Sequence, residues 1–415
     1  MGIVVQKFGG SSIADAEKIK RVAKRVVETK RQGNKVVTVV SAMGKNTDYL
    51  ISLAKQVSDN PPEREMDMLL ATGEQISIAL LAMAIQSMGE AVISLTGPQA
   101  GIKTDGTHCK AKILDISSER LHKELDQGKI VIVAGFQGTT ISDEITTLGR
   151  GGSDTTAVAI AAALKADMCE IFTDVDGVYA TDPRVVPNIK KLDTISCDEM
   201  LELASLGAKV LQPRAVEFAK LYNVKLHVRS SFNYNQGTIV QEARHMEKEI
   251  VVVGVAHDLN VAKMAVFGVP DKPGSASKIF KTLANNAINV DMIAQSAKVN
   301  GVNDIAFTIE KGDMEKAEVL LMDISKEINA KGISCMGDVA KVSIVGAGMI
   351  TNPGVAADMF EALAEAGINL EMISTSEIKV SVIIDANDCN KAVKKLIEKF
   401  NLQDTGQGIN TGTAE

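Results

Sequence analysis

The sequence predicts an α/β domain over residues 1–245, followed by two small α+β domains. In the first part, short apolar runs alternate with helical patterns, as in a largely parallel sheet covered by helices on both faces. Polarity then rises across Gln241–Glu249, which we interpret as a linker. Beyond it the chain repeats itself: Val261–Val269 resembles Val339–Ala347, and later residues match at an offset of 80. Two copies are too few for a solenoid, so a pair of domains is expected.

The predicted elements follow in order. The strands are the apolar runs Ile3–Val5, Lys35–Val40, Glu90–Leu95, Lys129–Ala134, Met168–Phe172 and Val224–Val228. The helices are Asp15–Thr29, Thr72–Met88, Ser153–Lys165 and Glu199–Leu203. Each repeat is expected to run strand, Pro-Gly turn, helix, strand, strand, helix, strand. Residues 404–415 are rich in Gly, Thr and Gln, which predicts a disordered tail.

The composition argues against two classes of function. The 415 residues carry 45 basic and 52 acidic side chains, a net charge of −7, whereas nucleic-acid-binding proteins usually present a basic face. Only 3% of the residues are aromatic and Trp is absent, which disfavours base-stacking platforms. The longest strongly apolar run, Ile76–Ile85, is too short to cross a bilayer, and Met1–Gln6 lacks the features of a signal peptide. We therefore expect no nucleic-acid partner and no membrane association.

Cysteine usage predicts a reducing, cytoplasmic location. The cysteines are odd in number and never spaced as Cys-x-x-Cys, so we expect free thiols. No His-x-x-x-His pair occurs either, and no metal site built from side chains is predicted. The cysteines are Cys109, Cys169, Cys197, Cys335 and Cys389.

A glycine-rich turn follows the first predicted strand, in the segment Lys7-Phe8-Gly9-Gly10-Ser11-Ser12. Glycines let main-chain N–H groups approach a phosphate, and the N-terminus of the helix that follows favours an anion. Lys7 would add a positive charge, although a plain tight turn is the alternative. The turn is not a P-loop, because the chain contains no G-x-x-x-x-G-K-[ST] sequence.

Two further segments combine turn residues with charge. Leu148–Asp154 opens an apolar helix, and helix capping alone would explain Ser153 or Asp154. Capping does not explain Arg150 between glycines, where a guanidinium could bind a carboxylate through two hydrogen bonds. Phe172–Arg184 follows a strand and would otherwise be a plain loop. It is not an EF-hand, because the twelfth residue counted from Asp174 is Val185 rather than Glu.

Together these segments resemble the active site of aspartate kinases, in the amino-acid kinase superfamily. Val5–Ile13 looks like the family signature, and Thr72–Glu74, Thr147–Thr156 and Phe172–Arg184 resemble the remaining motifs in the same order. The resemblance covers nearly the whole chain and implies a carbamate-kinase-like α/β sandwich. The repeated units resemble paired ACT domains, which are ferredoxin-like α+β domains that bind amino-acid effectors.

The resemblance implies a role for each matching residue. Lys7, Gly10 and Asp154 would be catalytic, with Asp154 orienting Lys7. The ATP site would comprise Lys7, Phe8, Gly9, Gly10, Ser41, Thr173, Asp174, Tyr179, Ala180, Thr181, Asp182, Pro183, Arg184 and Lys209. L-Aspartate would contact Thr47, Glu74, Arg150, Gly151, Gly152 and Ser153. Glu74 would bind its α-ammonium group and Arg150 its α-carboxylate. Ala180 stands where many relatives have Thr, which leaves the contacts of that position open.

The chemistry of these residues suits phosphoryl transfer to a carboxylate. An aspartate carboxyl group has a reference pKa of about 3.9, so the nucleophile is already ionised at neutral pH. No general base is required, and no histidine lies in the glycine-rich segments. Catalysis would depend on positioning and on charge stabilisation. ATP would bring Mg²⁺, held mainly by phosphates and water, so no protein metal cage is expected.

The ACT resemblance implies feedback regulation by lysine, threonine or both. The first ACT domain would cover residues 262–338, and the second would combine 250–261 with 339–403. The implied effector contacts are Asp271, Asn289, Val290, Asp291, Gln295, Asn369, Leu370 and Ser376. Such sites often form across a dimer, so a homodimer or larger oligomer is expected. Met246 lies in the linker, and initiation there would give a shorter chain containing only the ACT pair, although an ordinary linker methionine is equally expected.

Two other functions are alternatives to an aspartate kinase: a sister kinase of the same superfamily, and an amino-acid sensor without catalytic activity. Glutamate, acetylglutamate, carbamate and uridylate kinases belong to the same superfamily, but the ACT pair and Glu74 argue against them. A catalytically idle amino-acid sensor is a different class of function. The argument against that second alternative is the presence of four residues, namely Lys7, Glu74, Arg150 and Asp154.

Overall fold

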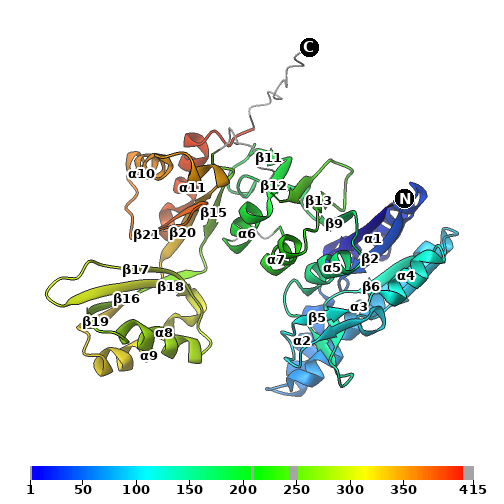
Figure 1. Cartoon of the computed structure of the whole chain (residues 1–415), viewed down its shortest axis with the longest axis horizontal. Coiled ribbons are helices and arrows are strands. Elements are labelled where there is room, and N and C mark those ends of the chain that lie inside the picture. Colours follow the sequence, from blue (N-terminus) through cyan, green and yellow to red (C-terminus); the bar gives the residue numbers. More distant parts are fainter. Residues whose placement is uncertain (1, 207–209, 243–250, 405–415) are drawn as a thin grey trace, which may run out of the picture. The chain divides into compact units, whose positions relative to one another are not determined.

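The computed structural model describes residues 2–206, 210–242 and 251–404 (Figure 1). These residues form two compact units. The first comprises residues 2–178, 191–205 and 210–242, and the second comprises 179–190, 206 and 251–404. The predictions for Lys209, for Met246 and for most of the linker and the tail lie outside the described residues.

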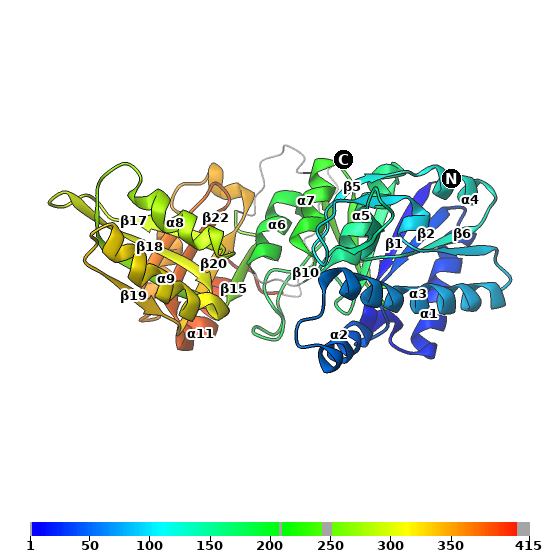
Figure 2. The same ribbon diagram turned by 90° about the horizontal axis from the view of Figure 1, so that it is seen from below.

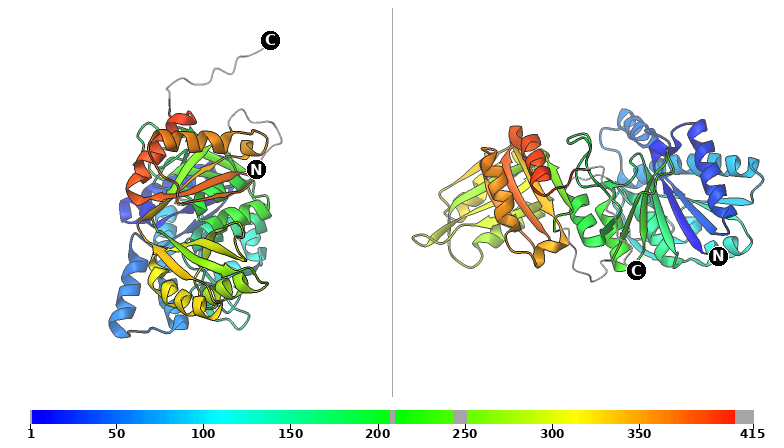
Figure 3. Two further views of the ribbon diagram at one scale, coloured as in Figure 1. Left: turned by 90° about the vertical axis from the view of Figure 1, so that its left-hand side faces the viewer. Right: turned by 90° about the horizontal axis from the view of Figure 1, so that it is seen from above.

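The first unit is built on an eight-stranded sheet. Its order is β12 (Thr194–Ser196), β14 (Thr238–Gln241), β13 (Leu226–Ser230), β9 (Met168–Thr173), β1 (Ile3–Phe8), β2 (Lys35–Val40), β6 (Ile130–Ala134) and β3 (Val92–Leu95). Neighbouring strands are parallel except for the antiparallel pair β13 and β14. The predicted α/β class and its six strands are confirmed, and the strands fan out side by side in Figure 3 (right).

Helices cover both faces of this sheet. On one face lie α1 (Ala16–Arg31) and α3 (Glu63–Ser87), which are neighbours in Figure 2. They share a buried core with the strands, in which Val26 and Leu81 are fully buried. On the other face, α5 (Gly152–Ala163) contacts β1, β2 and β9. The remaining helices of this unit are α2 (Asn46–Val57), α4 (Glu119–Asp126), α6 (Cys197–Ser205) and α7 (Pro213–Leu221).

A second, smaller sheet in this unit was not anticipated. Its order is β5 (Ile113–Ile116), β4 (Ile102–Thr104), β7 (Gln137–Thr139) and β8 (Ile145–Thr147). Two further short strands are β10 (Val178–Tyr179) and β11 (Lys191–Leu192). These strands are only two to four residues long, which leaves too few positions for an alternating pattern to identify them.

Helix α3 begins at Glu63, nine residues before the predicted start. Its first turns are charged on the exposed side, and this masks the buried positions Asp67 and Leu70 in the sequence pattern. Among the described residues, α3 is the one helix whose length and composition would suit a membrane span. Its buried Asp67 and Glu74, and its packing against α1, are features of a domain-core helix.

The second unit contains the two repeats as separate four-stranded sheets, coloured yellow-green and orange in Figure 3 (left). The first repeat has the order β17 (Val290–Gln295), β18 (Val302–Glu310), β16 (Val261–Pro270), β19 (Gly332–Met336), with helices α8 (Ser275–Asn285) and α9 (Met314–Glu327). The second has the order β15 (Gly254–Asp258), β20 (Val339–Val345), β22 (Lys379–Asp385), β21 (Met372–Thr375), with helices α10 (Val355–Glu365) and α11 (Cys389–Lys399). The second sheet therefore takes its edge strand β15 from the chain that precedes the first repeat.

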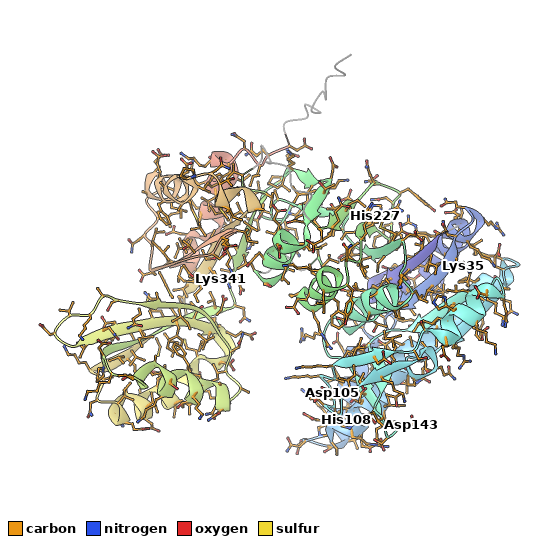
Figure 4. The ribbon with its side chains drawn as sticks, in the orientation of Figure 1. Lys35, Asp105, His108, Asp143, His227 and Lys341 are labelled. Atoms are coloured by element: carbon orange, nitrogen blue, oxygen red, sulfur yellow. The ribbon has the colours of Figure 1, made fainter. Side chains whose placement is uncertain are left out.

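Equivalent residues of the two repeats meet where the sheets adjoin. Lys263 Nζ lies 3.0 Å from Glu371 Oε2, and Lys341 Nζ, labelled in Figure 4, lies 2.5 Å from Asp291 Oδ2. The lysines occupy matching positions of the repeated Val-Ala-Lys sequence, and the carboxylates match at the offset of 80. A small buried core beside them joins Val261, Met292, Val339, Met372 and Ile383, four of which are also repeat equivalents.

Candidate functional site

The glycine-rich turn lies at the carboxyl end of the central strand β1. Lys7 is nine-tenths buried, and its Nζ lies 2.5 Å from Asp154 Oδ1 of helix α5. A Cβ on Gly9 would lie 3.5 Å from Lys7 Nζ, so the ammonium group sits beside the turn. The carboxyl edge of a parallel sheet is where α/β proteins bind ligands. The structure thus places a buried cation next to main-chain N–H groups at such an edge.

Position 10 requires a glycine, because the main chain after strand β2 lies too close to leave room for a side chain. A Cβ there would lie 2.7 Å from the carbonyl oxygen of Ala42 and 3.0 Å from that of Gly44, which follow strand β2. The Gly44 N–H group donates a hydrogen bond to the Gly10 carbonyl at 3.0 Å. The ends of β1 and β2 are therefore locked together. The turn keeps the close backbone approach that a phosphate cradle requires.

Glu74 points from helix α3 toward the same edge of the sheet. Its Oε1 accepts a hydrogen bond from the Ala42 N–H group at 2.9 Å, while its buried Oε2 has no hydrogen-bond partner. Burial raises the pKa of the Glu74 carboxyl to about 8, and the Ala42 hydrogen bond only partly opposes this shift. A buried carboxylate oxygen without a partner is costly unless a ligand supplies a donor.

The amino terminus of α5 faces the turn. The helix starts at Gly152 with Gly151 as its N-cap, so Ser153 and Asp154 lie inside the first turn. The capping interpretation of these two side chains is therefore wrong. Ser153 Oγ instead lies 2.7 Å from Ser41 Oγ, which joins α5 to the end of β2. A Cβ on Gly135 would lie 2.7 Å from Ser153 Cβ, so this approach requires a glycine at the end of β6.

The remaining predicted contacts of the first unit surround this edge. Thr47 lies in the first turn of α2, and Arg150 is exposed in the turn before α5. Within the described part of the chain, no carboxylate forms an ion pair with Arg150. Phe8 is buried against Phe172 in a stacked pair, and Thr173 and Asp174 follow at the end of β9. The predicted cation, glycines and substrate-binding side chains of this unit thus come from strand ends and helix N-termini, except Glu74, which lies in the middle of α3.

Part of the predicted ATP site belongs to the second unit. Ala180 is fully buried in the core of the second repeat, and its carbonyl accepts a hydrogen bond from the Val255 N–H group. Thr181 is buried, and Asp182 forms an ion pair with Arg184 at 2.7 Å. Residues 179–184 as ATP contacts, Pro183 included, remain a prediction.

The predicted effector residues lie on the two repeats of the second unit. Asp291 pairs with Lys341, and Asn369 donates to Glu371 at 3.3 Å, so both adjoin the ion pairs between the repeats. Asp271 pairs instead with Lys298. The others lie on strand ends and loops of the two sheets: Asn289, Val290, Gln295, Leu370 and Ser376. Their roles remain a prediction.

Sequence reasoning missed the residues that hold the Arg150 turn. Arg214 in the first turn of α7 donates to the Leu148 carbonyl at 3.1 Å, and Asp67 accepts from Thr147 Oγ1 at 2.5 Å. Neither residue belongs to a recognisable motif. The signal available was weak: Pro213 marks a helix start, and Asp67 is one of two acidic residues, with Glu74, on the buried face of α3.

Comparisons with known proteins show which families the chain resembles. The sequence pattern of the amino acid kinase family matches residues 2–230, and that of the ACT domain matches 265–322 and 342–400. The chain is 56% identical to an aspartokinase of Bacillus sp. (strain MGA3), over 97% of this chain and 98% of the relative. It is also similar to E. coli aspartokinase III. The structure with aspartate and ADP (R-state) is 25% identical, with a TM-score of 0.81 over 96% of this chain and 99% of that one. The structure with lysine and aspartate (T-state) gives a TM-score of 0.76 at 25% identity over the same shares.

Proposed function

The chain belongs to the aspartokinase branch of the amino acid kinase family, and we propose that it phosphorylates L-aspartate with ATP. The products are ADP and 4-phospho-L-aspartate, the first intermediate on the way to lysine, threonine and methionine. The observation that carries this function is the buried Lys7–Asp154 pair beside the Gly9–Gly10 turn. A catalytically idle sensor has no need to keep an ammonium group buried at that edge, because an unused buried charge is costly.

In this mechanism the residues position charge rather than move protons. A β-carboxylate oxygen of aspartate attacks the γ-phosphorus as the bond to the bridging β–γ oxygen breaks, and ADP leaves with that electron pair. Negative charge builds up on the phosphoryl oxygens, and the Lys7 ammonium group and the N–H groups of the glycine turn would stabilise it. Asp154 holds the Lys7 side chain in place.

We propose that Mg²⁺ enters with the nucleotide. Mg²⁺ is usually held by one or two carboxylates together with substrate phosphates and water, and it neutralises phosphate charge. Within the described residues there is no group of three or more His, Cys, Asp or Glu side chains placed to hold a metal ion. Asp174 at the end of β9 is a carboxylate on the same edge of the sheet as Lys7.

For aspartate itself, we assign the α-ammonium group to Glu74 and the α-carboxylate to Arg150. Glu74 Oε2 is buried without a partner, so an ammonium donor would satisfy it. Arg150 is exposed and free of carboxylate partners among the described residues, so its guanidinium is available for two hydrogen bonds. Thr47 would complete the pocket from α2.

We propose that the ACT pair senses lysine, threonine or both. E. coli aspartokinase III has been solved with lysine, and the ACT pattern matches both repeats here. The effector residues adjoining Asp291 and Glu371 lie beside the contact between the repeats. A ligand that binds there would act on the arrangement of the two sheets.

A direct assay tests the function. Purified protein with ATP, Mg²⁺, L-aspartate and hydroxylamine should form aspartyl hydroxamate, and lysine or threonine should suppress this product. Product with glutamate or N-acetylglutamate, but none with aspartate, would assign the chain to a sister kinase. No product with any acceptor, in a sample that still binds lysine or threonine, would favour the sensor function.

We further propose a cytoplasmic homodimer, or a larger oligomer, formed through the ACT sheets. Four large apolar side chains are exposed on these sheets by 38–52%, and three of them line a cavity of about 430 Å³. They are Phe267, Ile293, Met336 and Ile373. Exposed apolar surface gathered in one place is typical of protein–protein contacts. A shorter ACT-only chain beginning at Met246 would carry the same surface.

Light scattering tests this proposal. The wild-type mass should be at least twice 44.1 kDa, and Ile373→Asp should reduce it toward one chain because a charge would be buried in the contact. Val319→Asp is the matched control, since Val319 is 62% exposed on α9. An unchanged mass for Ile373→Asp would exclude this face. A denaturing gel of the same sample would reveal any chain that starts at Met246.

A further inference from the structure

The turn that carries Arg150 has one internal main-chain hydrogen bond, from the Gly152 N–H group to the Gly149 carbonyl at 3.0 Å. Gly149 and Gly151 on either side of Arg150 both have positive φ, at 77° and 69°. Glycine loses the most conformational freedom when it is ordered, so a turn flanked by two glycines needs ties from outside. An arginine that must meet a carboxylate with two parallel hydrogen bonds tolerates little movement of its main chain.

Helix α7 supplies one such tie. Arg214 donates one hydrogen bond to the Leu148 carbonyl at 3.1 Å and another to the Ala111 carbonyl at 3.0 Å. Two residues earlier, Gln212 packs directly on the turn, because a Cβ on Gly151 would lie 1.9 Å from Gln212 Cγ. The N-terminus of α7 therefore holds the main chain on both sides of Arg150.

The other anchor of Arg214 is itself fixed. Ala111 lies near the end of the loop 105–112, and its N–H group donates a hydrogen bond to the Thr147 carbonyl at 2.9 Å. Asp105 accepts from the Lys112 N–H group at 2.9 Å, so the loop is closed by its own side chain. Asp105 and His108, another residue of this loop, are labelled in Figure 4.

Asp67 secures the same loop from the core. This fully buried carboxylate lies 2.7 Å from His108 Nδ1 and accepts from the Cys109 N–H group at 3.1 Å. It also accepts from Thr147 Oγ1, one residue before Leu148. Arg214 thus joins Leu148, at the start of the turn, to a loop that is held by the buried Asp67 carboxylate.

We infer that Arg214 is a positioning residue for L-aspartate, acting through the turn that carries Arg150. This inference rests on the proposed function, because it takes Arg150 as the group that binds the α-carboxylate. Arg214 spans two carbonyls and has no carboxylate partner among the described residues, so its two hydrogen bonds serve the main chain alone. Without it, Leu148 and Ala111 lose their common donor and the turn gains freedom.

Steady-state kinetics of Arg214→Gln provide the test. We expect the KM for aspartate to rise about tenfold, whereas kcat at saturating aspartate and the KM for ATP change less than about twofold. Arg214→Lys should restore part of the loss, because an ammonium group can still donate to carbonyl oxygens. Arg64→Gln is the matched control, since Arg64 is exposed and its ion pairs within the described residues are with Glu65 and Glu144.

Arg150→Ala, measured in parallel, separates the possible failures. If Arg150→Ala raises the KM for aspartate and Arg214→Gln does not, the positioning role is overturned while the proposed function stands. If Arg214→Gln raises both KM values, lowers kcat and lowers the melting temperature together, the residue is only structural. If the wild type makes no aspartyl phosphate, the proposed function itself fails, and the inference fails with it.

Discussion

Replacing Lys7 by alanine should lower kcat by about 100- to 1,000-fold, the cost of removing one preorganised electrostatic stabiliser. The reason is the position of its ammonium group, which is buried beside the glycine turn at the edge where phosphoryl charge would develop. The loss should fall on kcat and on kcat/KM together, because the interaction strengthens in the transition state. Hydroxamate formation at saturating ATP and aspartate measures it.

Lys35→Ala is the control for that measurement. Lys35, labelled in Figure 4, begins strand β2 and makes an ion pair with Asp126 at 2.6 Å, with about a third of its side chain exposed. Its removal should leave turnover unchanged, because exposed pairs contribute little. Lysine and threonine binding should survive Lys7→Ala, since the effector residues lie on the second unit. Full turnover of Lys7→Ala would refute the role assigned to Lys7.

The second large effect is a pH dependence of aspartate binding that depends on Glu74. Burial raises the pKa of this carboxyl to about 8, so in the free protein it is protonated at lower pH. Only the ionised form attracts the α-ammonium group. The KM for aspartate should therefore fall as pH rises from 6 to 8, by up to about tenfold per unit, and level off above 8.

Glu74→Gln should raise the KM for aspartate and flatten this profile, because the amide does not ionise. Kinetics at saturating ATP between pH 6 and 9 would show both changes. Glu17→Gln is the control, since Glu17 is exposed on α1. A wild-type KM that stays constant below pH 8 would contradict the assignment of Glu74 to the ammonium group.

The raised pKa of Glu74 has the opposite effect on the folding stability of the free protein: rising pH strengthens aspartate binding but lowers this stability. Between the ordinary value of 4.5 and about 8, the folded state binds the Glu74 proton more tightly than the unfolded state does. The contribution of Glu74 to folding stability therefore declines as pH rises through this window. Bound aspartate would offset that decline, because its ammonium group stabilises the ionised carboxylate.

The local patterns of the chain predicted the sheet, whereas the resemblance to aspartate kinases implied the residues of the candidate site. Buried parallel strands are continuous apolar runs, so β1, β2, β6 and β9 were evident. Because such strands end at one edge, the segments that follow them had to converge. Asp154 instead reaches Lys7 from helix α5, which follows a strand of the smaller sheet and packs on β1.

Long-range ties between irregular segments could not be predicted in the same way. Arg214 and Asp67 act through a few hydrogen bonds to loop residues that are distant in the sequence, and no periodicity or motif marks such contacts. The stretch from Phe172 to Arg184 looked continuous, yet Ala180 is buried with the second repeat. Burial partners of a short irregular segment depend on tertiary packing, which a local pattern does not encode.

The paired lysines and carboxylates between the repeats have a consequence for assembly. Each repeat contributes one lysine and one carboxylate to the contact, Lys263 with Asp291 from the first and Lys341 with Glu371 from the second. The contact surface of each repeat therefore carries one positive and one negative group, so its charges are complementary to those of a second copy of the same repeat. A first repeat deprived of its neighbour could form an isologous pair, with each Lys263 reaching the Asp291 of the other molecule. The contact between the two repeats of one chain therefore has the pattern of charges that the interface of a symmetric dimer of single repeats would have.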